Sequence, residues 1–130
     1  MAVSKLQGRE WFGAAMLARD HGGNTVLICR SIMASSVMAA RLLIIRLSFE
    51  RLKRQGVERL WCKAGGKKWL NPIAGNTVVD WRLHPVHEDI NKLRESFEFL
   101  GIFTASHPLA REVKKLADKA AETRVSYSWP

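Results

Sequence analysis

A short segment near residue 85 carries the side chains best suited to metal binding or proton transfer. It contains His84, His87, Glu88 and Asp89. Imidazole and carboxylate groups bind zinc and act as general acids and bases, so a metal site or an acid–base pair is one interpretation. The other is the start of a helix, where carboxylates favour the positive end and the histidines are solvated. Because no second ligand pair stands out, we favour the helix start and expect no metal and no cofactor.

A second group of residues combines positive charge with aromatic rings. It begins in a long helical pattern, continues through a strand-rich segment, and consists of Arg46, Arg51, Lys53, Arg54, Arg59, Trp61, Lys63, Lys67, Lys68, Trp69 and Arg82. Trp61 alternates with Arg59 and Lys63, so these three side chains would share one face of a strand. Several proteins that bind single-stranded nucleic acid use such a face, where bases stack on rings and cations follow the phosphates. This group is the predicted nucleic-acid-binding site.

The same tryptophans also fit a simpler explanation. Tryptophan usually buries most of its surface, so Trp61, Trp69 and Trp81 could all be core residues that pack on the long helix. Their lysine and arginine neighbours would then be ordinary solvated side chains. The sequence leaves both explanations open.

The net charge indicates what kind of partner the chain would bind. The formal net charge is +9 at pH 7, and residues 31–83 carry +7 of it. Residues 84–130 are neutral overall. A local surplus of this size favours an anionic partner, and nucleic acid is the commonest one.

The sequence motifs of nucleotide-binding loops and catalytic nucleophiles are absent. The chain contains no G-x-x-x-x-G-K-[ST], no G-x-G-x-x-G and no G-x-S-x-G. Gly65 and Gly66 lie between two strand-like segments, where a hairpin turn is expected rather than a phosphate loop. Nothing in the sequence therefore argues for an enzyme.

Cysteine usage and hydropathy bear on the compartment. Cys29 and Cys62 lie in apolar, strand-like runs, which is typical of buried free thiols, and we expect both to be reduced. The first ten residues contain no apolar segment of a signal peptide. No apolar run reaches the roughly 20 residues that a membrane-spanning helix needs. We expect a cytoplasmic protein with no membrane partner.

The longest helical pattern covers residues 31–55, and the rest of the chain is organised around it. Ser31 is a candidate N-cap, and Gly56 fits the position after the last turn. The apolar arc is wide, which predicts that the first half is covered on nearly all sides. Arg41 falls at the centre of this arc, and we expect its head group to pair with a carboxylate or an anion.

The remaining segments predict a small sheet and further helices. Residues 4–20 are expected to form a first helix, and residues 25–29 a strand or the entry to the long helix. Strands over 57–63, 67–71 and 77–83 would form an antiparallel meander. Two helices, joined by the linker IFTA, would then pair as a hairpin through an apolar seam that includes Phe97.

These elements predict a single α+β domain over residues 1–130. A small antiparallel sheet, with three strands and a candidate fourth, packs on the long central helix, with an N-terminal helix and a C-terminal helical hairpin. The favoured function is non-catalytic binding of nucleic acid, single-stranded in preference to duplex, by the basic surface of residues 46–82. The alternative is a small regulator or inhibitor from a mobile element or phage, whose neutral hairpin docks on a nucleic-acid-processing complex. An enzyme acting through residues 84–89 is the third alternative.

Overall fold

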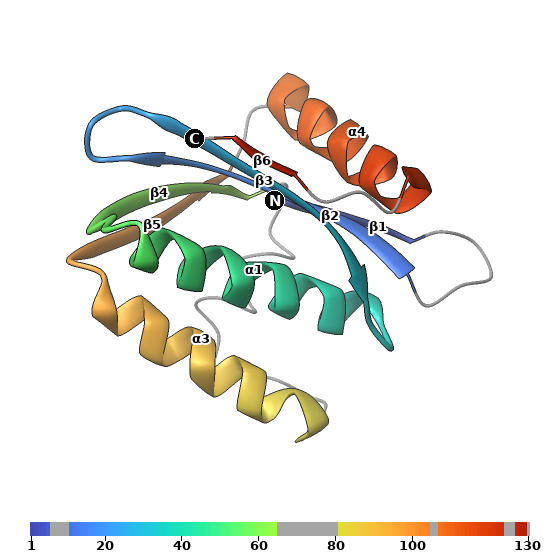
Figure 1. The fold of residues 1–130 in the computed structure, drawn as a ribbon, viewed down its shortest axis with the longest axis horizontal. Coiled ribbons are helices and arrows are strands. Elements are labelled where there is room, and N and C mark those ends of the chain that lie inside the picture. The colour runs from blue at the N-terminus through green and yellow to red at the C-terminus, as the bar shows by residue number, and fades with distance from the viewer. Residues whose placement is uncertain (6–10, 65–80, 105–106, 124–126, 130) are drawn as a thin grey trace.

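The computed structural model describes residues 1–5, 11–64, 81–104, 107–123 and 127–129 (Figure 1). Its elements are, in chain order, the strands β1 (Ala2–Lys5), β2 (Trp11–Asp20) and β3 (Thr25–Met33), the helix α1 (Val37–Arg54), the strand β4 (Arg59–Ala64), the short 3-10 helix η2 (Trp81–Leu83), the helix α3 (His84–Ser96), the strand β5 (Phe99–Thr104), the helix α4 (His107–Thr123) and the strand β6 (Tyr127–Trp129). This mixture of a sheet with separate helices confirms the predicted α+β class.

One six-stranded sheet organises the fold, in the order β5-β4-β2-β3-β6, with β1 also paired to β2. The long strand β2 pairs along one edge with β3, from Trp11 opposite Met33 to Arg19 opposite Thr25. Along its other edge β2 pairs first with β1 and then, through Ala18–Asp20, with β4. These pairs are antiparallel, whereas β4 and β5 run parallel. The sheet is therefore mixed, and not purely antiparallel as predicted.

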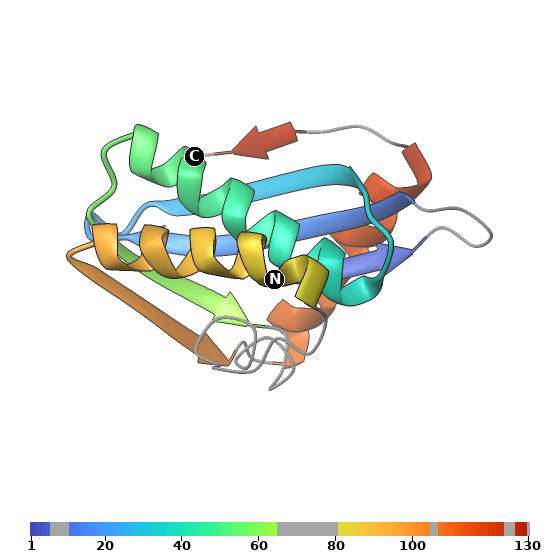
Figure 2. The ribbon, with the colours of Figure 1, turned by 90° about the horizontal axis from the view of Figure 1, so that it is seen from below.

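The helices cover the two faces of the sheet unequally. α1 and α3 lie side by side on one face, and α4 lies alone on the other (Figure 1). Figure 2, seen from the side of α1 and α3, shows both helices crossing in front of the sheet. α4 contacts β1, β2 and β3, and it lies over that half of the sheet. At the β4–β5 edge, the face on the α4 side therefore carries no helix among the described residues.

Apolar side chains fill the space on both sides of the sheet. The larger core lies between the sheet and α1, and its fully buried members include Met16, Ile28, Leu42, Ile45 and Phe49. The smaller core lies under α4 and contains Ala15, Cys29, Val113 and Ala117. The strands β2 and β3 are consequently buried on both faces, which is typical of central strands.

The long helix α1 begins later than expected from the sequence. Its N-cap is Ser36, whose side chain accepts a hydrogen bond from the Ala39 backbone amide at 3.1 Å. The prediction that Ser31 caps this helix is wrong, because β3 continues through Ser31 to Met33.

The C-terminal end of α1 lies where it was predicted. Gly56 has a φ of 82°, and its amide donates to the Lys53 carbonyl at 3.0 Å. The Val57 amide donates to the Leu52 carbonyl at 3.1 Å, which completes a Schellman motif. Neither α1 nor any other helix within the described residues is long and apolar enough to cross a membrane.

The predicted N-terminal helix over 4–20 is wrong, because the described part of this segment forms β1 and β2. Phe12, Ala14, Met16 and Ala18 face α1, whereas the residues between them face α4. Burial on both sides removes the polar–apolar alternation that identifies a strand in a sequence.

The predicted C-terminal helical hairpin is also wrong. α3 and α4 lie on opposite faces of the sheet, and the predicted linker between them forms part of β5. The apolar seam of α3 does pack, but its partner is α1: Ile90 and Phe97 are buried in the larger core. The Phe97 ring meets the Phe49 ring edge-on, with centroids 5.9 Å apart.

The predicted meander is confirmed only in part. Its first strand corresponds to β4, which pairs with β2 and β5. Residues 67–71 and 77–80 lie outside the described residues. Residues 81–83, predicted as the end of a strand, form η2 instead. The candidate fourth strand over 25–29 is confirmed as β3.

Candidate nucleic-acid interface

The strand β4 alternates between the core and the outer face of the sheet. Leu60 and Cys62 are fully buried in the larger core, on the side of the sheet that carries α1 and α3. Their neighbours Arg59, Trp61 and Lys63 therefore point to the opposite face, which α4 leaves uncovered at this edge. The three side chains share one face of a strand, as predicted, and Trp61 does not pack on the long helix.

The strand β5 adds two aromatic rings to this face. In the parallel register, Phe99 lies opposite Arg59, and Phe103 lies opposite Lys63. Phe99 is 37% exposed and Phe103 is 43% exposed, so both rings present open surface to solvent. We call the set Arg59, Trp61, Lys63, Phe99 and Phe103 the cationic–aromatic face.

The rings and cations of the cationic–aromatic face contact one another. The Trp61 and Phe99 ring centroids are 5.1 Å apart, and the ring planes are tilted by 39°. The central carbon of the Arg59 guanidinium lies 5.7 Å from the Trp61 centroid and 5.8 Å from the Phe99 centroid. The Lys63 ammonium lies 5.7 Å from the Phe103 centroid. These cation–π contacts keep each charge beside an aromatic surface.

Gly101 lets the two phenylalanine rings approach each other over the backbone of β5. A Cβ atom at this position would lie 2.7 Å from Cε2 of Phe103 and 3.0 Å from Cε1 of Phe99. Any side chain there would push the rings apart. Gly101 is also the residue opposite Trp61, so no side chain separates Phe99 from Phe103 beside the Trp61 ring.

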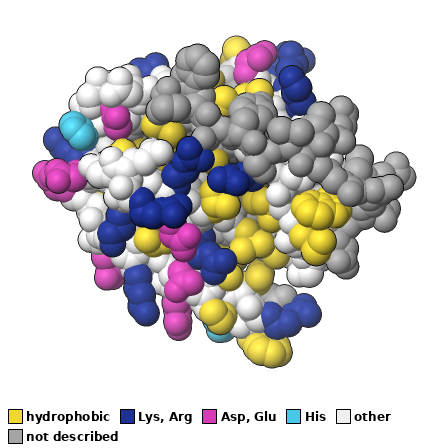
Figure 3. Space-filling model, viewed as in Figure 1, with side chains coloured by type: hydrophobic (Ala, Val, Ile, Leu, Met, Phe, Trp, Pro, Cys, Tyr) yellow, Lys and Arg dark blue, Asp and Glu magenta, His cyan; other side chains and the backbone are white. Residues whose placement is uncertain are grey.

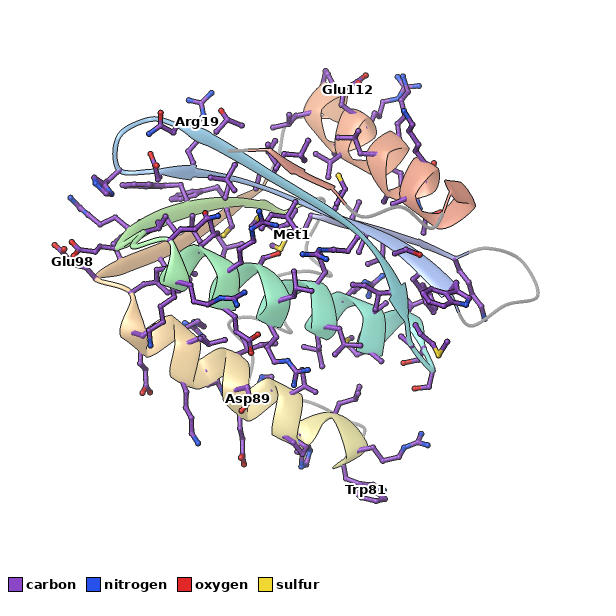
Figure 4. The ribbon with its side chains drawn as sticks, in the orientation of Figure 1. Met1, Arg19, Trp81, Asp89, Glu98 and Glu112 are labelled. Carbon is purple, nitrogen blue, oxygen red and sulfur yellow. The ribbon has the colours of Figure 1, made fainter. Side chains whose placement is uncertain are left out.

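Arg19 extends the positive charge of this surface onto β2. It lies opposite Trp61 in the antiparallel pairing of β2 with β4, so the two side chains share a face. Arg19 is exposed, and Figure 4 shows it directed away from α1 and α3. The cationic–aromatic face is thus bordered by a further cation on its β2 side.

The chemistry of these six side chains is that of binding. Exposed ring faces can stack on bases, and guanidinium and ammonium groups can donate hydrogen bonds to phosphate oxygens. None of the six carries a carboxylate, an imidazole or a thiol. The face therefore offers stacking surfaces and positive charge.

The helical members of the predicted site lie away from this face. Arg51, Lys53 and Arg54 are in the last turn of α1, the helix that covers the other side of the sheet. Arg46 pairs with Asp89 of α3 at 3.3 Å. In the view of Figure 3, which includes α4 above and α3 below, Lys and Arg side chains are interspersed with Asp and Glu side chains. In this view, charge alone does not single out one binding surface.

The remaining members of the predicted site lie beyond β4. Arg82 is exposed in η2, and its neighbour Trp81 is 74% exposed, so Trp81 is not a core residue. Lys67, Lys68 and Trp69 lie outside the described residues. Of the predicted site, the structure thus brings together Arg59, Trp61 and Lys63.

The cluster of potential metal ligands belongs to the start of α3. His84, His87, Glu88 and Asp89 all lie in its first two turns, as the helix-start interpretation predicted. Asp89 is paired with Arg46. Within the part of the chain that the structure describes, no three His, Cys, Asp or Glu side chains gather closely enough to hold a metal ion.

The predictions for the cysteines and for Arg41 can also be compared with the structure. Cys29 and Cys62 are free and buried, as predicted. Burial raises the pKa of the Cys62 thiol to about 12. Arg41 is partly buried on α1, and this burial lowers the pKa of its guanidinium. Its pairing with a carboxylate or an anion stays a prediction.

Sequence reasoning missed Arg19, Phe99 and Phe103. Arg19 lies in the segment predicted as a helix, and the two phenylalanines lie at the end of another predicted helix and in the linker after it. The sign of β5 in the sequence is the short apolar run over residues 99–103, which periodicity alone does not distinguish from the end of a helix. Leu100 and Ile102 pack against the larger core, so Phe99 and Phe103 face outward.

Comparison with known proteins identifies no relative. The chain matches no protein-family model, no curated protein and no solved structure. The functional argument therefore depends on the chemistry of the described residues.

Proposed function

We propose that the protein binds single-stranded nucleic acid on the cationic–aromatic face, without catalysing a reaction. The observation that carries this proposal is the contact of Arg59 with the rings of Trp61 and Phe99, next to the pair formed by Lys63 and Phe103. Stacking on such rings is worth about 1–3 kcal/mol per base and accepts any base. The net charge of +9 supports a polyanionic partner.

A single strand fits this face better than a duplex. Stacking on a side chain needs a base whose face is free, and in a duplex the bases already stack on each other. Proteins that read a duplex usually insert a helix or a ribbon into a groove. Here the rings of Phe99 and Phe103 lie over Gly101 on the face of a sheet, and not on a helix or ribbon that could enter a groove.

The proposal is tested by the affinity of Trp61→Ala for labelled oligothymidine and oligouridine, measured by fluorescence anisotropy. Wild type is expected to bind at micromolar concentration or tighter at low salt and to weaken steeply as salt is added. Trp61→Ala is expected to lose about 1–3 kcal/mol of binding free energy, because one stacking surface is removed.

Trp81→Ala is the matched control, because Trp81 is 74% exposed in η2 and does not belong to the face. It should bind like wild type, and the circular dichroism spectra of both variants should match that of wild type. Equal binding by all three proteins would place the binding surface elsewhere.

The docking alternative lacks the surface first assigned to it, since the helical hairpin does not form. A different group of exposed apolar side chains lies around the start of α1: Met33 is 59%, Val37 41% and Met38 38% exposed. A protein partner held there by apolar contacts would bind with little dependence on salt. If neither oligonucleotide binds wild type at low salt, this alternative becomes the better one.

A further inference from the structure

A second basic feature lies on the side of the sheet opposite the cationic–aromatic face. Arg30 of β3 and Arg51 and Arg54 of α1 line a hollow of about 380 Å³, together with Gln55. Arg30 points toward α1 because it alternates along β3 in phase with Ile28, which is buried in the larger core. Two arginines one helical turn apart thus meet a third from the sheet.

No carboxylate that the structure describes neutralises these three guanidinium groups. The described residues of the lining include no Asp or Glu. Among the described residues, none forms an ion pair with Arg30, Arg51 or Arg54. The Nε atom of Arg30 is buried and has no hydrogen-bond partner. Since buried donors are normally satisfied, an unpartnered donor on one of the three arginines supports a missing anionic partner.

The end of α1 does not by itself explain these arginines. Cations do stabilise the negative end of a helix, and unpaired carbonyl groups there often accept hydrogen bonds from side chains. In α1, however, the carbonyls of residues 51–53 already accept hydrogen bonds from the backbone amides of residues 55–57. Arg30 comes from a strand and takes no part in this helix end.

We propose that Arg30, Arg51 and Arg54 bind a phosphate group in this hollow. Guanidinium groups donate pairs of parallel hydrogen bonds to phosphate oxygens, and both partners are charged. The hollow is larger than one phosphate, so it leaves room for a second phosphate or for the sugar attached to the first. The phosphate belongs either to the backbone of a nucleic acid or to a free phosphate compound. This site does not depend on the cationic–aromatic face.

The test follows the arginine side chains directly by nuclear magnetic resonance. Titration of ¹⁵N-labelled wild type with inorganic phosphate and with pyrophosphate at low salt is expected to shift the Nε–Hε signal of Arg30 until saturation. The double variant Arg51→Gln/Arg54→Gln is expected to bind pyrophosphate about tenfold more weakly or worse, because charge-assisted hydrogen bonds are lost. Arg30→Gln serves as the second variant if the double variant does not fold.

Lys53→Gln/Lys92→Gln is the matched control. It removes the same charge from exposed positions of α1 and α3 that do not line the hollow, and it should bind pyrophosphate nearly as well as wild type. A wild type without a saturable shift at Arg30, or equal weakening in both double variants, would overturn the proposal.

Addition of oligothymidine to the pyrophosphate-bound protein identifies the source of the phosphate. Displacement of pyrophosphate from the hollow indicates a nucleic-acid backbone, and simultaneous binding of both indicates a free phosphate compound. Trp61→Ala separates this site from the proposed function, because it should leave the pyrophosphate titration unchanged.

Discussion

Trp61 lies on the outer face of the sheet because Leu60 and Cys62 occupy the inner one. Both neighbours are fully buried, and successive side chains of a strand point to opposite faces. This part of the site could be predicted from the sequence, since Arg59 and Lys63 are costly to bury and alternate with apolar residues. The sequence could not show which face stays open, because that depends on the distant helix α4.

The inner residue Cys62 leads to a prediction about stability in alkaline solution. Burial raises the pKa of its thiol to about 12, whereas a thiol in an unfolded chain has a pKa of about 8.5. Between these values the unfolded chain binds fewer protons than the folded one. The free energy of unfolding should therefore fall as the pH rises, by at most about 1.4 kcal/mol per pH unit for this group.

Urea denaturation over a series of pH values above 8 measures this fall. Other groups, chiefly lysines, titrate in the same range, so the comparison is made with Cys62→Ala. The variant lacks the buried thiol and should lose stability less steeply with pH than wild type. If the free energy of unfolding falls equally steeply with pH in the two proteins, the Cys62 thiol ionises as easily in the folded chain as in the unfolded one.

Among the elements, β2 shows most clearly where the sequence misleads. Its ten residues are rich in alanine and buried on both faces, so no alternation distinguishes them from a helix. Gly13 distinguishes the observed strand from the predicted helix, because in the strand a Cβ atom at this position would lie 1.8 Å from the backbone oxygen of Ala117 in α4. The close approach of α4 to β2 requires a residue without a side chain at this position.

Gly13→Ala should therefore destabilise the protein, by about 3 kcal/mol or more, because α4 has to move away from the sheet. In a helix interior the same change would stabilise by roughly 0.5–1 kcal/mol, so the sign of the effect distinguishes the two structures. Urea denaturation monitored by circular dichroism measures it.

Gly22→Ala, in the turn between β2 and β3, is the control for the loss of a glycine. Its Cβ atom would lie 3.1 Å from the end of the flexible Asn24 side chain, and its effect should be within about 1 kcal/mol. A Gly13→Ala protein as stable as wild type would mean that α4 does not approach β2 so closely.

Long, one-sided elements were easier to predict than short or doubly buried ones. α1 could be predicted because its 18 residues keep one helical period and because Gly56 follows its C-cap. β5 could not, because its six residues follow directly on the helical seam of α3. Because β5 was not predicted, the predicted site lacked Phe99 and Phe103, which are two of the three rings of the cationic–aromatic face.

In the whole molecule, positive charge is distributed over both sides of the sheet. The cationic–aromatic face and Arg19 lie on the side of α4, and the hollow formed by Arg30, Arg51 and Arg54 lies on the side of α1. A basic protein attracts nucleic acid through its overall charge as well as through specific contacts. A test of the proposed face must therefore separate local charge from total charge.

The salt dependence of binding makes this separation. For single strands, the slope of log affinity against log salt concentration is about 0.7 for each phosphate contacted. Replacing Arg19, Arg59 and Lys63 by glutamine should therefore reduce the slope for oligothymidine by about 2, if each cation contacts one phosphate.

A second triple variant carries glutamine at Lys92, Arg111 and Lys115, which are exposed in α3 and α4. It changes the net charge by the same amount, so any effect of total charge should be equal in the two proteins. Because these three side chains lie outside the cationic–aromatic face, the slope should stay close to that of wild type. If both triple variants reduce the slope equally, the strand is held by the overall charge of the molecule, and the rings on β4 and β5 do not define its path.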